Sequence, residues 1–391
     1  MKPIRIVALW CVVATCVFIP MSTAAAGQES ERETVARLKQ LNVRMKFNGQ
    51  QRVTVLDFAI ARNRTTVTDE VIAGVNLKPL TELEELVFPG VTDAELAQLE
   101  QLTKLRRVSL AFSKITDAGL LHLKGLPNLK ELDLYYSTVT DAGIATLRDF
   151  PNLEWLHFGS PHLTAASMIH VSQLKQLTYL QVSSFPISAR ELVELKNLTR
   201  LKHLRVSAAR IPDDGLEFLP ELKELVSLDI SYNGTTLTNN CLRHVAELKG
   251  LRDLRLSDLV RVNEGGLERL AGMTNLRKLF LNGTRVTDAG LVYVAEMTRL
   301  TELQVGGTRI TDAGLIHLEG LQDLQLLNLS GTPITDAGLE HLKRLRSLER
   351  LMLDFTKVTP AGVNMLRRSL PAANITAMGE YRGKTGVESK K

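Results

Sequence analysis

The stretch Ile310-Thr-Asp-Ala-Gly-Leu315 decides the fold of this chain, because the chain repeats it. The same pattern begins again 24 residues away on either side, at Val286 and Ile334, and occurs earlier at Ile115 and Val139, also 24 residues apart. Self-similarity at a fixed period of about 20 to 50 residues is typical of solenoids, whose units stack on one another. The sequence therefore predicts an elongated array.

Weaker copies keep nearly the same register between and beyond the five good ones. They begin at Val67, Val91, Leu163, Ile187, Ile211, Leu237, Val262 and Val358. Five good and eight degenerate copies predict about thirteen repeats, the first and last serving as caps. Two short additions, near 233–236 and 258–261, fall on predicted strand-to-helix turns, where loops at a rim often carry specificity.

A second pattern, L-x-x-L-x-L-x-x-T, precedes each copy and is complete from Leu324 to Thr332. Its central Leu-x-Leu alternates with period 2, which predicts a short strand with both leucines inward. Leu315, Leu318 and Leu321 recur three apart, which predicts one face of a short helix. Each repeat is therefore expected to supply one strand and one helix.

The turn residues have physical roles in this scheme. The Thr-Asp pair is expected to cap the helix and to place a negative charge at its N-terminus, and the glycine permits close backbone approach. A threonine also recurs after each strand, where its hydroxyl can satisfy the turn backbone. This predicted buried column contains Thr284, Thr308, Thr332 and Thr356.

These motifs resemble the leucine-rich-repeat family, specifically the cysteine-containing-like subclass whose helical half reads I-T-D-x-G-L-x-x-L, as in exported bacterial members. The resemblance covers residues 53–370. It implies an α/β, right-handed solenoid, or horseshoe, with a parallel sheet on its concave face, helices on its convex face, and protein binding as its use. F-box proteins share the repeat type, but residues 27–52 leave no room for an F-box.

The first 26 residues predict a secretory signal peptide. Lys2 and Arg5 precede the apolar run 6–21, and small residues end the segment at Ala26. An uncleaved membrane anchor is the alternative. Cleavage predicts export to the periplasm or the cell exterior, and it leaves Cys241 as the one cysteine, so the mature chain forms no internal disulfide.

The segments flanking the array are expected to close its core. In 27–52, Ser30-x-x-Glu33 reads as a capping box for an N-terminal capping helix, with apolar residues at helical spacing. These apolar residues are Val35, Leu38, Leu41 and Met45. Residues 371–391 are expected to form a C-terminal cap and a loose polar tail, with Leu366, Leu370 and Ile375 closing the core.

Charge and motifs argue against several function classes. The net charge is +5, or +3 without Lys2 and Arg5, too small and too evenly spread to indicate nucleic-acid binding. No later segment predicts a membrane span. Phosphate-binding glycine loops and C-x-x-C are missing from the sequence, and the five histidines that share one helix position do not form a metal-ligand set. We therefore predict no enzyme activity, no metal and no cofactor.

The residues between the strand leucines are expected to line the concave face in columns. One column runs through Arg107, Glu131, Trp155, Tyr179, His203, Ser227, Asp253, Lys278 and Glu302. The next runs through Ser109, Asp133, His157, Gln181, Arg205, Asp229, Arg255, Phe280 and Gln304. Ser109, Asp133 and His157 contain the residue types of a hydrolase triad, but the acid rather than the histidine occupies the middle. Opposite charges farther along predict ion pairs between neighbouring strands.

An aromatic cluster in the N-terminal half is the candidate ligand-binding surface, with stacking that stabilises the sheet as the alternative. The candidate residues are Phe112, Tyr135, Tyr136, Trp155, His157, Tyr179 and Arg205. The sequence thus predicts a monomeric, non-catalytic scaffold of the cell envelope or exterior that binds a protein or an envelope polysaccharide. The alternatives are a self-assembling envelope protein and an intracellular adaptor of F-box-like repeat type.

Overall fold

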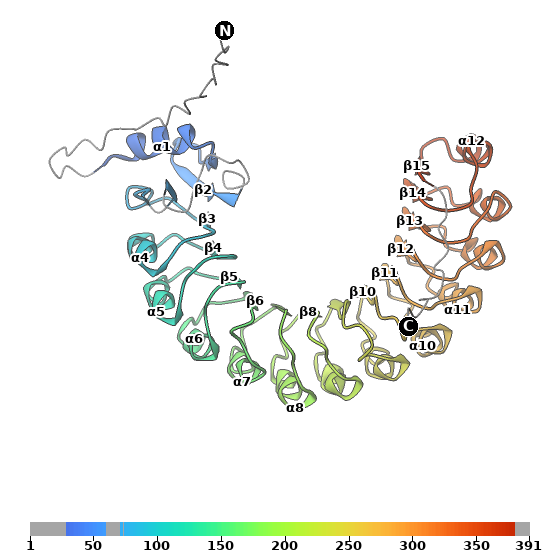
Figure 1. The fold of residues 1–391 in the computed structure, drawn as a ribbon, viewed down its shortest axis with the longest axis horizontal. Coiled ribbons are helices and arrows are strands. Elements are labelled where there is room, and N and C mark those ends of the chain that lie inside the picture. The colour runs from blue at the N-terminus through green and yellow to red at the C-terminus, as the bar shows by residue number, and fades with distance from the viewer. Residues whose placement is uncertain (1–28, 60–70, 73, 380–391) are drawn as a thin grey trace, which may run out of the picture.

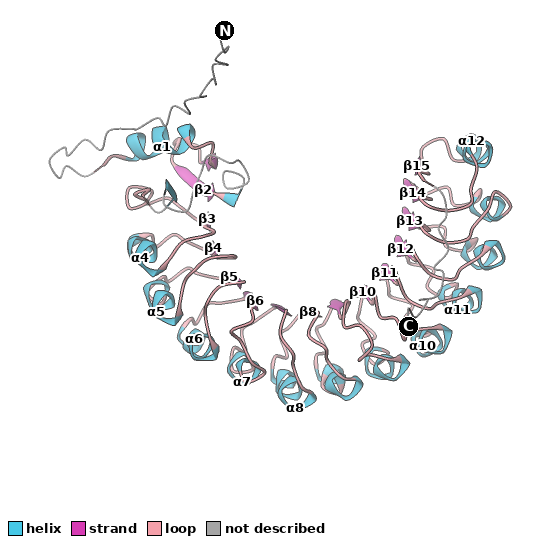
Figure 2. Ribbon diagram, in the orientation of Figure 1, coloured by secondary structure: helices cyan, strands magenta, loops and turns pink. Residues whose placement is uncertain are grey.

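A computed structural model describes residues 29–59, 71–72 and 74–379. The predicted signal peptide, the degenerate copy at Val67 and the tail beyond residue 379 lie outside the described residues. Within the described residues, fifteen strands form one sheet whose spatial order equals their order in the chain. The strands line the inside of a curved solenoid and the helices cover its outside (Figures 1 and 2). The predicted horseshoe is confirmed.

The strands are short, and all pairs except β1–β2 are parallel. Their bounds are β1 Arg44–Phe47, β2 Val53–Asp57, β3 Glu85–Val87, β4 Arg107–Ser109, β5 Glu131–Tyr135, β6 Trp155–Gly159, β7 Tyr179–Ser183, β8 His203–Ser207, β9 Ser227–Asp229, β10 Asp253–Arg255, β11 Lys278–Phe280, β12 Glu302–Gln304, β13 Leu326–Asn328, β14 Arg350–Met352 and β15 Asn374–Thr376.

The helical halves are equally short, and several are wholly or partly 3₁₀ helix (η). The α-helices are α1 Glu31–Gln40, α4 Asp93–Leu96, α5 Asp117–Leu120, α6 Asp141–Thr146, α7 Ser167–Val171, α8 Ala189–Leu192, α9 Leu242–Val245, α10 Glu264–Leu270, α11 Asp288–Val294 and α12 Pro360–Ser369. The 3₁₀ helices are η1 Ala97–Gln101, η2 Leu121–Leu123, η3 Leu147–Asp149, η4 Val193–Asn197, η5 Asp213–Leu216, η6 Leu219–Glu221, η7 Asn239–Cys241, η8 Asp312–Leu318 and η9 Gly338–Leu342.

One contiguous hydrophobic core runs along the solenoid between sheet and helices. In a typical repeat, Leu327 of β13 and the following Leu329 are fully buried, and so are Leu315 and Leu318 of η8. The period-2 and three-apart leucine patterns are therefore confirmed. Because no repeat encloses its own leucines, each repeat is stable only with neighbours stacked on both sides.

The predicted threonine column is confirmed. The Thr284 hydroxyl donates to the Leu281 carbonyl at 2.7 Å, and the Thr308 hydroxyl donates to the Val305 carbonyl at 2.7 Å. Thr332 and Thr356 repeat this bond, and all four side chains are buried. A buried carbonyl that would lose its water on folding thus keeps a hydrogen bond in each turn.

The Thr-Asp-Ala-Gly motif ties neighbouring repeats together. The Thr311 hydroxyl accepts the Ala313 N–H at 3.4 Å as the N-cap of η8, and the Thr335 hydroxyl accepts the Ala337 N–H at 3.2 Å in the same way. The Asp312 carboxylate of the preceding repeat accepts the Thr335 N–H at 2.8 Å and its hydroxyl at 2.6 Å. We call this paired contact the Asp–Thr bridge. It recurs at Asp93–Thr116, Asp117–Thr140, Asp141–Thr164, Asp213–Thr238, Asp288–Thr311 and Asp336–Thr359.

The motif glycine makes room for this bridge. A Cβ atom at Gly338 would overlap the Asp312 carboxylate, and the same overlap arises at Gly119, Gly143, Gly314 and Gly362. The expectation of close approach is confirmed for these glycines, although the partner is a side chain of the preceding repeat. Ser167 and Cys241 fill the same position beside the Asp141–Thr164 and Asp213–Thr238 bridges, so the bridge also forms where the backbone has adjusted to a Cβ.

The bridge is interrupted in the middle of the solenoid. Ala165 and Ala189 occupy the aspartate position there and have no carboxylate to offer the next repeat. The repeat after Ala165 has Glu191 where the motif has glycine, and no clash arises because no carboxylate faces it.

The N-terminal cap is a helix followed by a strand. The Ser30–Glu33 capping box is present, with the Ser30 N–H donating to Glu33 Oε2 at 2.7 Å. The helix ends at Gln40 because Asn42 adopts a left-handed conformation (φ 54°), and the Val43 N–H closes the end on the Leu38 carbonyl at 3.1 Å.

One expectation at the N-terminal end of the array was wrong. Met45 does not continue the helix, because it lies in β1, which pairs antiparallel with β2 and covers that edge of the sheet. At the other end the sheet continues past residue 370, since β15 pairs with β14. Leu366, Leu370 and Ile375 are buried there, as predicted.

Candidate functional site

The two predicted concave columns are confirmed by the strand register. Trp155 of β6 lies opposite Tyr179 of β7, and Tyr179 lies opposite His203 of β8. In the neighbouring column, His157 lies opposite Gln181, which lies opposite Arg205. A near-constant repeat length places equivalent positions side by side, so the sequence alone could locate these neighbours.

The concave aromatic residues form one continuous run of ring contacts, the aromatic strip, which consists of Tyr135, His157, Trp155, Tyr179 and His203. The Tyr135 and His157 rings stack at 4.7 Å between centroids, and Trp155 and Tyr179 stack at 4.9 Å. Trp155 meets His157 edge to face at 6.1 Å, and Tyr179 lies 5.8 Å from His203. His203 was in the predicted column but not in the candidate set.

The stacking limits what the strip can offer a ligand. Strands about 4.8 Å apart allow the Tyr135–His157 and Trp155–Tyr179 pairs to stack, so in each pair a ring covers one face of its neighbour and leaves its edge for other contacts. Those edges carry polar groups: Tyr179 donates its hydroxyl to Gln181 Oε1 at 3.0 Å, and Tyr135 shares a 3.3 Å hydroxyl contact with Ser184. The half-buried rings therefore present an amphipathic edge to the concave face.

The candidates Phe112 and Tyr136 lie where the aromatic strip meets the rim. Phe112 contacts Tyr135 at 5.5 Å and stacks on Tyr136 at 5.7 Å, so the three rings form one group. Phe112 and Tyr136 are 56% and 44% exposed, and both have left-handed backbones, with φ 58° and 53°. The six candidates other than Arg205 are thus joined by ring contacts.

The same left-handed position carries two aromatic residues that sequence reasoning missed. Tyr232 and Phe355 have φ 62° and 58° and are 60% and 55% exposed. Glycine fills the position at Gly283, Gly307 and Gly331 without steric penalty. The sequence contained a signal for this position. Each of these residues comes directly before the residue that its repeat contributes to the buried turn column, as Phe355 comes before Thr356.

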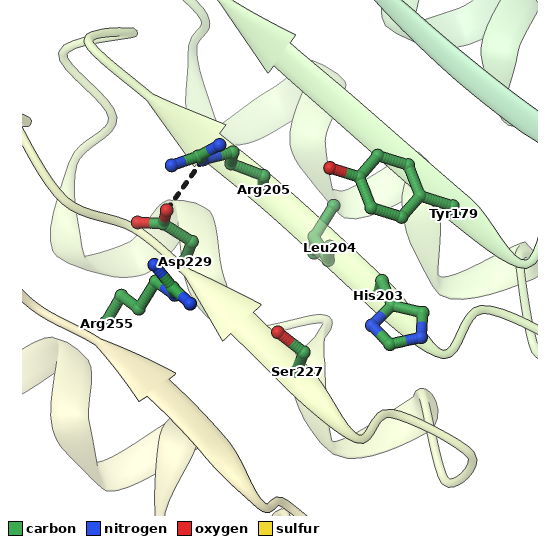
Figure 3. A pocket seen from close by; sticks show the side chains of 7 residues that line it. All are labelled: Tyr179, His203, Leu204, Arg205, Ser227, Asp229 and Arg255. Atoms are coloured by element: carbon green, nitrogen blue, oxygen red, sulfur yellow. Dashed lines mark hydrogen bonds and ion pairs between the residues drawn. The ribbon is translucent and has the colours of Figure 1, made fainter. Parts of the chain in front are cut away.

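Arg205 lines a hollow at the end of the aromatic strip with a volume of about 220 Å³. It donates to Asp229 at 2.6 Å, and Tyr179, His203 and Arg255 share the lining (Figure 3). Burial raises the pKa of Tyr179 above its ordinary value, against the lowering effect of Arg205. Burial lowers the pKa of His203, so the aromatic part of this hollow is uncharged near neutral pH.

The predicted cross-strand charge pairs are partly correct. Arg205 pairs with Asp229, and Lys278 lies 3.4 Å from Glu302 on the next strand. Arg255 differs: it pairs with Asp253 of its own strand at 3.2 Å and covers the Phe280 ring at 4.1 Å. Because the Asp229 carboxylate is already paired with Arg205, Arg255 gains more by pairing with Asp253 and covering the Phe280 ring.

The Ser109, Asp133 and His157 arrangement has the predicted order. Ser109 donates to Asp133 Oδ2 at 3.0 Å, and His157 Nδ1 lies 3.0 Å from Oδ1 of the same carboxylate. Although burial acts to raise the pKa of Asp133, the hydrogen bond and charge of His157 hold it below its ordinary value. Asp133 separates the serine from the histidine, so this histidine cannot take the serine proton.

Within residues 29–59, 71–72 and 74–379, no helix is both long and apolar enough to cross a bilayer. The same residues contain no group of three or more histidine, cysteine, aspartate or glutamate side chains placed to hold a metal ion. His122 and His341, which share the repeated helix position, instead contact Glu100 and Glu319 of the preceding repeats at 2.6 and 2.8 Å.

Comparisons with known proteins support the fold. A family model described as "Leucine Rich repeat" matches residues 297–318 and 320–343. An internalin, InlF from Listeria monocytogenes, is structurally similar with a TM-score of 0.56 and 21% identity, covering 89% of this chain and 95% of the internalin. The TLR13–ssRNA13 complex gives a TM-score of 0.50 and 18% identity, covering 77% of this chain and 51% of TLR13. No curated protein sequence matches the chain.

Proposed function

We propose that this leucine-rich-repeat solenoid is a non-catalytic, protein-binding scaffold of the cell envelope or exterior, and that its aromatic strip contacts the partner. Leucine-rich-repeat proteins are typically non-catalytic binding scaffolds. Export rests on the leader sequence 1–26, and we assign the repeats to the cysteine-containing-like subclass on the Thr-Asp-Ala-Gly motif.

The observation that carries the proposal is the unbroken run of ring contacts across β5 to β8. Hot spots of protein interfaces are enriched in tryptophan, tyrosine and arginine, and they cluster at the centre of the contact. Here Trp155 and Tyr179 lie next to Arg205 on a concave surface, with Phe112 and Tyr136 exposed at the rim. Such rings supply contact area at low entropic cost.

The same surface argues against a nucleic-acid partner. Asp229 and Asp253 of the two columns pair with Arg205 and Arg255, so this part of the concave face has no unpaired basic patch for phosphate. The outward ring edges and their hydroxyl groups suit a protein partner better than a nucleic acid, because a protein surface offers hydrogen-bonding groups beside apolar contacts.

The test compares the purified protein with two triple variants in pull-downs from envelope extract, followed by titration of the captured protein after purification. The first, Tyr135→Ala/Trp155→Ala/Tyr179→Ala, removes the aromatic strip. The matched control removes three exposed aromatics elsewhere, at Phe47, Tyr232 and Phe355. We expect the strip variant to weaken binding by about 30-fold or more, since a hot-spot residue contributes about 2 kcal/mol. The control should bind as the wild type does.

Other outcomes point to the alternatives. If the strip variant unfolds more readily but binds the same partner equally well, the rings serve sheet packing. A sedimentation coefficient that rises with protein concentration would indicate self-assembly. Capture that survives proteolysis of the extract would indicate a polysaccharide. A mature protein that keeps Met1 in cells would contradict export with leader cleavage.

A further inference from the structure

A second hollow lies at the rim beside the aromatic strip. Its volume is about 420 Å³, within the range of about 300 to 1,000 Å³ typical of ligand pockets. The 3.3 Å contact between the hydroxyls of Tyr135 and Ser184 joins it to the strip. We call it the rim hollow; it is lined by Tyr136, Ser184, Phe185, Pro186, Ala208 and Arg210.

The lining combines an apolar surface with a single cation. Pro186, Ala208 and the exposed Tyr136 ring supply the apolar part, whereas Phe185 lies beneath them in the core against Phe158. Arg210 is the one charged residue of the lining. The Arg210 side chain is exposed, and it has no ion pair with any residue in the described ranges. This contrasts with Arg205 on the same repeat, which is bound to Asp229. The rim hollow therefore carries an unbalanced positive charge.

The turn that presents Arg210 is strained and firmly held. Ala208 and Arg210 both have left-handed backbones, φ 54° and 51°, whereas the turns at Gly307 and Gly331 use one left-handed glycine each. A non-glycine residue in this region costs about 1–2 kcal/mol. Such strain persists only where the surrounding structure over-determines it, and it concentrates at functional positions.

Asn233 supplies the restraint. Its buried side chain accepts the Ala209 N–H at 3.0 Å and the Ile211 N–H at 3.4 Å, on both sides of Arg210. Its amide donates to the carbonyls of Val206 and Ile230, both at 2.8 Å. Asn233 occupies the buried turn-column position that Thr332 holds in its repeat, directly before the added residues of the first rim insertion.

We propose that the rim hollow binds an extended polypeptide segment of the partner in which an aspartate or glutamate, placed next to a small apolar side chain, pairs with Arg210. The apolar side chain packs on the exposed Pro186 and Ala208. The carboxylate meets the planar guanidinium, which can donate two parallel hydrogen bonds. The apolar lining favours a peptide over an acidic glycan, which has no apolar side chain to fill it. This inference rests on the proposed protein-binding function and specifies its partner.

The test uses a phage-displayed library of random heptapeptides, selected on the purified protein and counter-selected on Arg210→Gln. We expect enriched peptides to carry Asp or Glu beside Ala, Val or Pro. Synthetic versions should bind Arg210→Gln at least about tenfold more weakly than wild type, as for loss of a hydrogen bond to a charged group. Arg148→Gln, an equal charge change at an exposed residue of η3, should leave binding unchanged.

Reversing both charges of the proposed pair distinguishes loss of the Arg210 contact from loss of folding. A peptide whose acid is replaced by lysine should lose binding to wild type and regain it with Arg210→Glu. If no acidic peptide is enriched, or if enriched peptides ignore both Arg210 substitutions, the proposal is overturned. Polygalacturonate that binds through Arg210 when no peptide does would overturn the polypeptide assignment.

The aromatic strip is tested separately with Trp155→Ala/Tyr179→Ala. Peptides that depend on this pair but not on Arg210 would leave the proposed function standing and reject the rim hollow as a site. Peptides that depend on Arg210 but not on the pair support the rim hollow and reject the strip as the contact. Dependence on neither residue set rejects both.

Discussion

Asp312 holds Thr335 across the boundary between two repeats, accepting its backbone N–H at 2.8 Å and its hydroxyl at 2.6 Å. The Thr-Asp-Ala-Gly motif is therefore a connection between repeats as much as a helix start. Threonine donates, the preceding aspartate accepts, and the glycine of the next repeat leaves space for the carboxylate.

Gly338→Ala should destabilise the solenoid by about 1–3 kcal/mol, because its Cβ would overlap the Asp312 carboxylate and the Asp–Thr bridge would have to shift to fit it. The matched control is Gly320→Ala, where no atom lies within 4 Å of the new Cβ. Thermal unfolding of both variants measures the difference. Equal melting temperatures for the two would refute this role of the glycine.

Restoring the missing bridge should stabilise the middle of the array. In Ala165→Asp/Glu191→Gly, the new carboxylate can accept the Ser188 N–H and also the Ser188 hydroxyl, which in the wild type donates to Glu191. One hydrogen bond is thus gained and one exchanged, a net contribution of about 0.5–1.5 kcal/mol. The single Ala165→Asp should be less stable than the double variant, since Glu191 has a Cβ where most bridges have glycine and competes for the Ser188 hydroxyl. Urea unfolding of all four members of the cycle gives the coupling energy, which should be favourable; a value near zero contradicts the bridge.

Tyr232→Gly should leave the protein at least as stable as wild type. The left-handed backbone of Tyr232 costs about 1–2 kcal/mol, which glycine avoids, while the more flexible unfolded chain offsets about 0.4–1 kcal/mol. Tyr232→Ala keeps the strain and should be less stable than Tyr232→Gly. Differential scanning calorimetry orders the three proteins, and a clear loss for glycine would mean that the exposed ring supports the fold.

Acid should weaken the contribution of Asp133. Its folded pKa lies below the ordinary value, so the unfolded state binds the proton more readily, and the stabilisation is fully present above about pH 4. It is lost as the pH falls through the folded pKa. The gap in melting temperature between wild type and Asp133→Asn should therefore shrink from pH 6 to pH 2. In a His157→Gln background the shrinkage should be smaller, because His157 is a main cause of the low pKa. A gap that does not change with pH would contradict this assignment.

Much of the fold could be predicted because the 24-residue period carries the information. Equivalent positions of successive repeats lie side by side in a parallel sheet, so the sequence placed Trp155 beside Tyr179 and His157 beside Gln181. The Thr332 column and the inward pair Leu327 and Leu329 followed from the same spacing. These are statements about which residues are neighbours.

The tertiary structure decided how those neighbours meet. It turned the rings of Trp155 and Tyr179 face to face, gave Arg255 to Asp253 rather than to Asp229, and placed the Arg210 turn in a strained conformation. It also ended the first helix at Gln40. These outcomes depend on backbone and side-chain torsions and on competition between partners a few ångströms apart, whereas the period of a repeat sets only the spacing from one unit to the next.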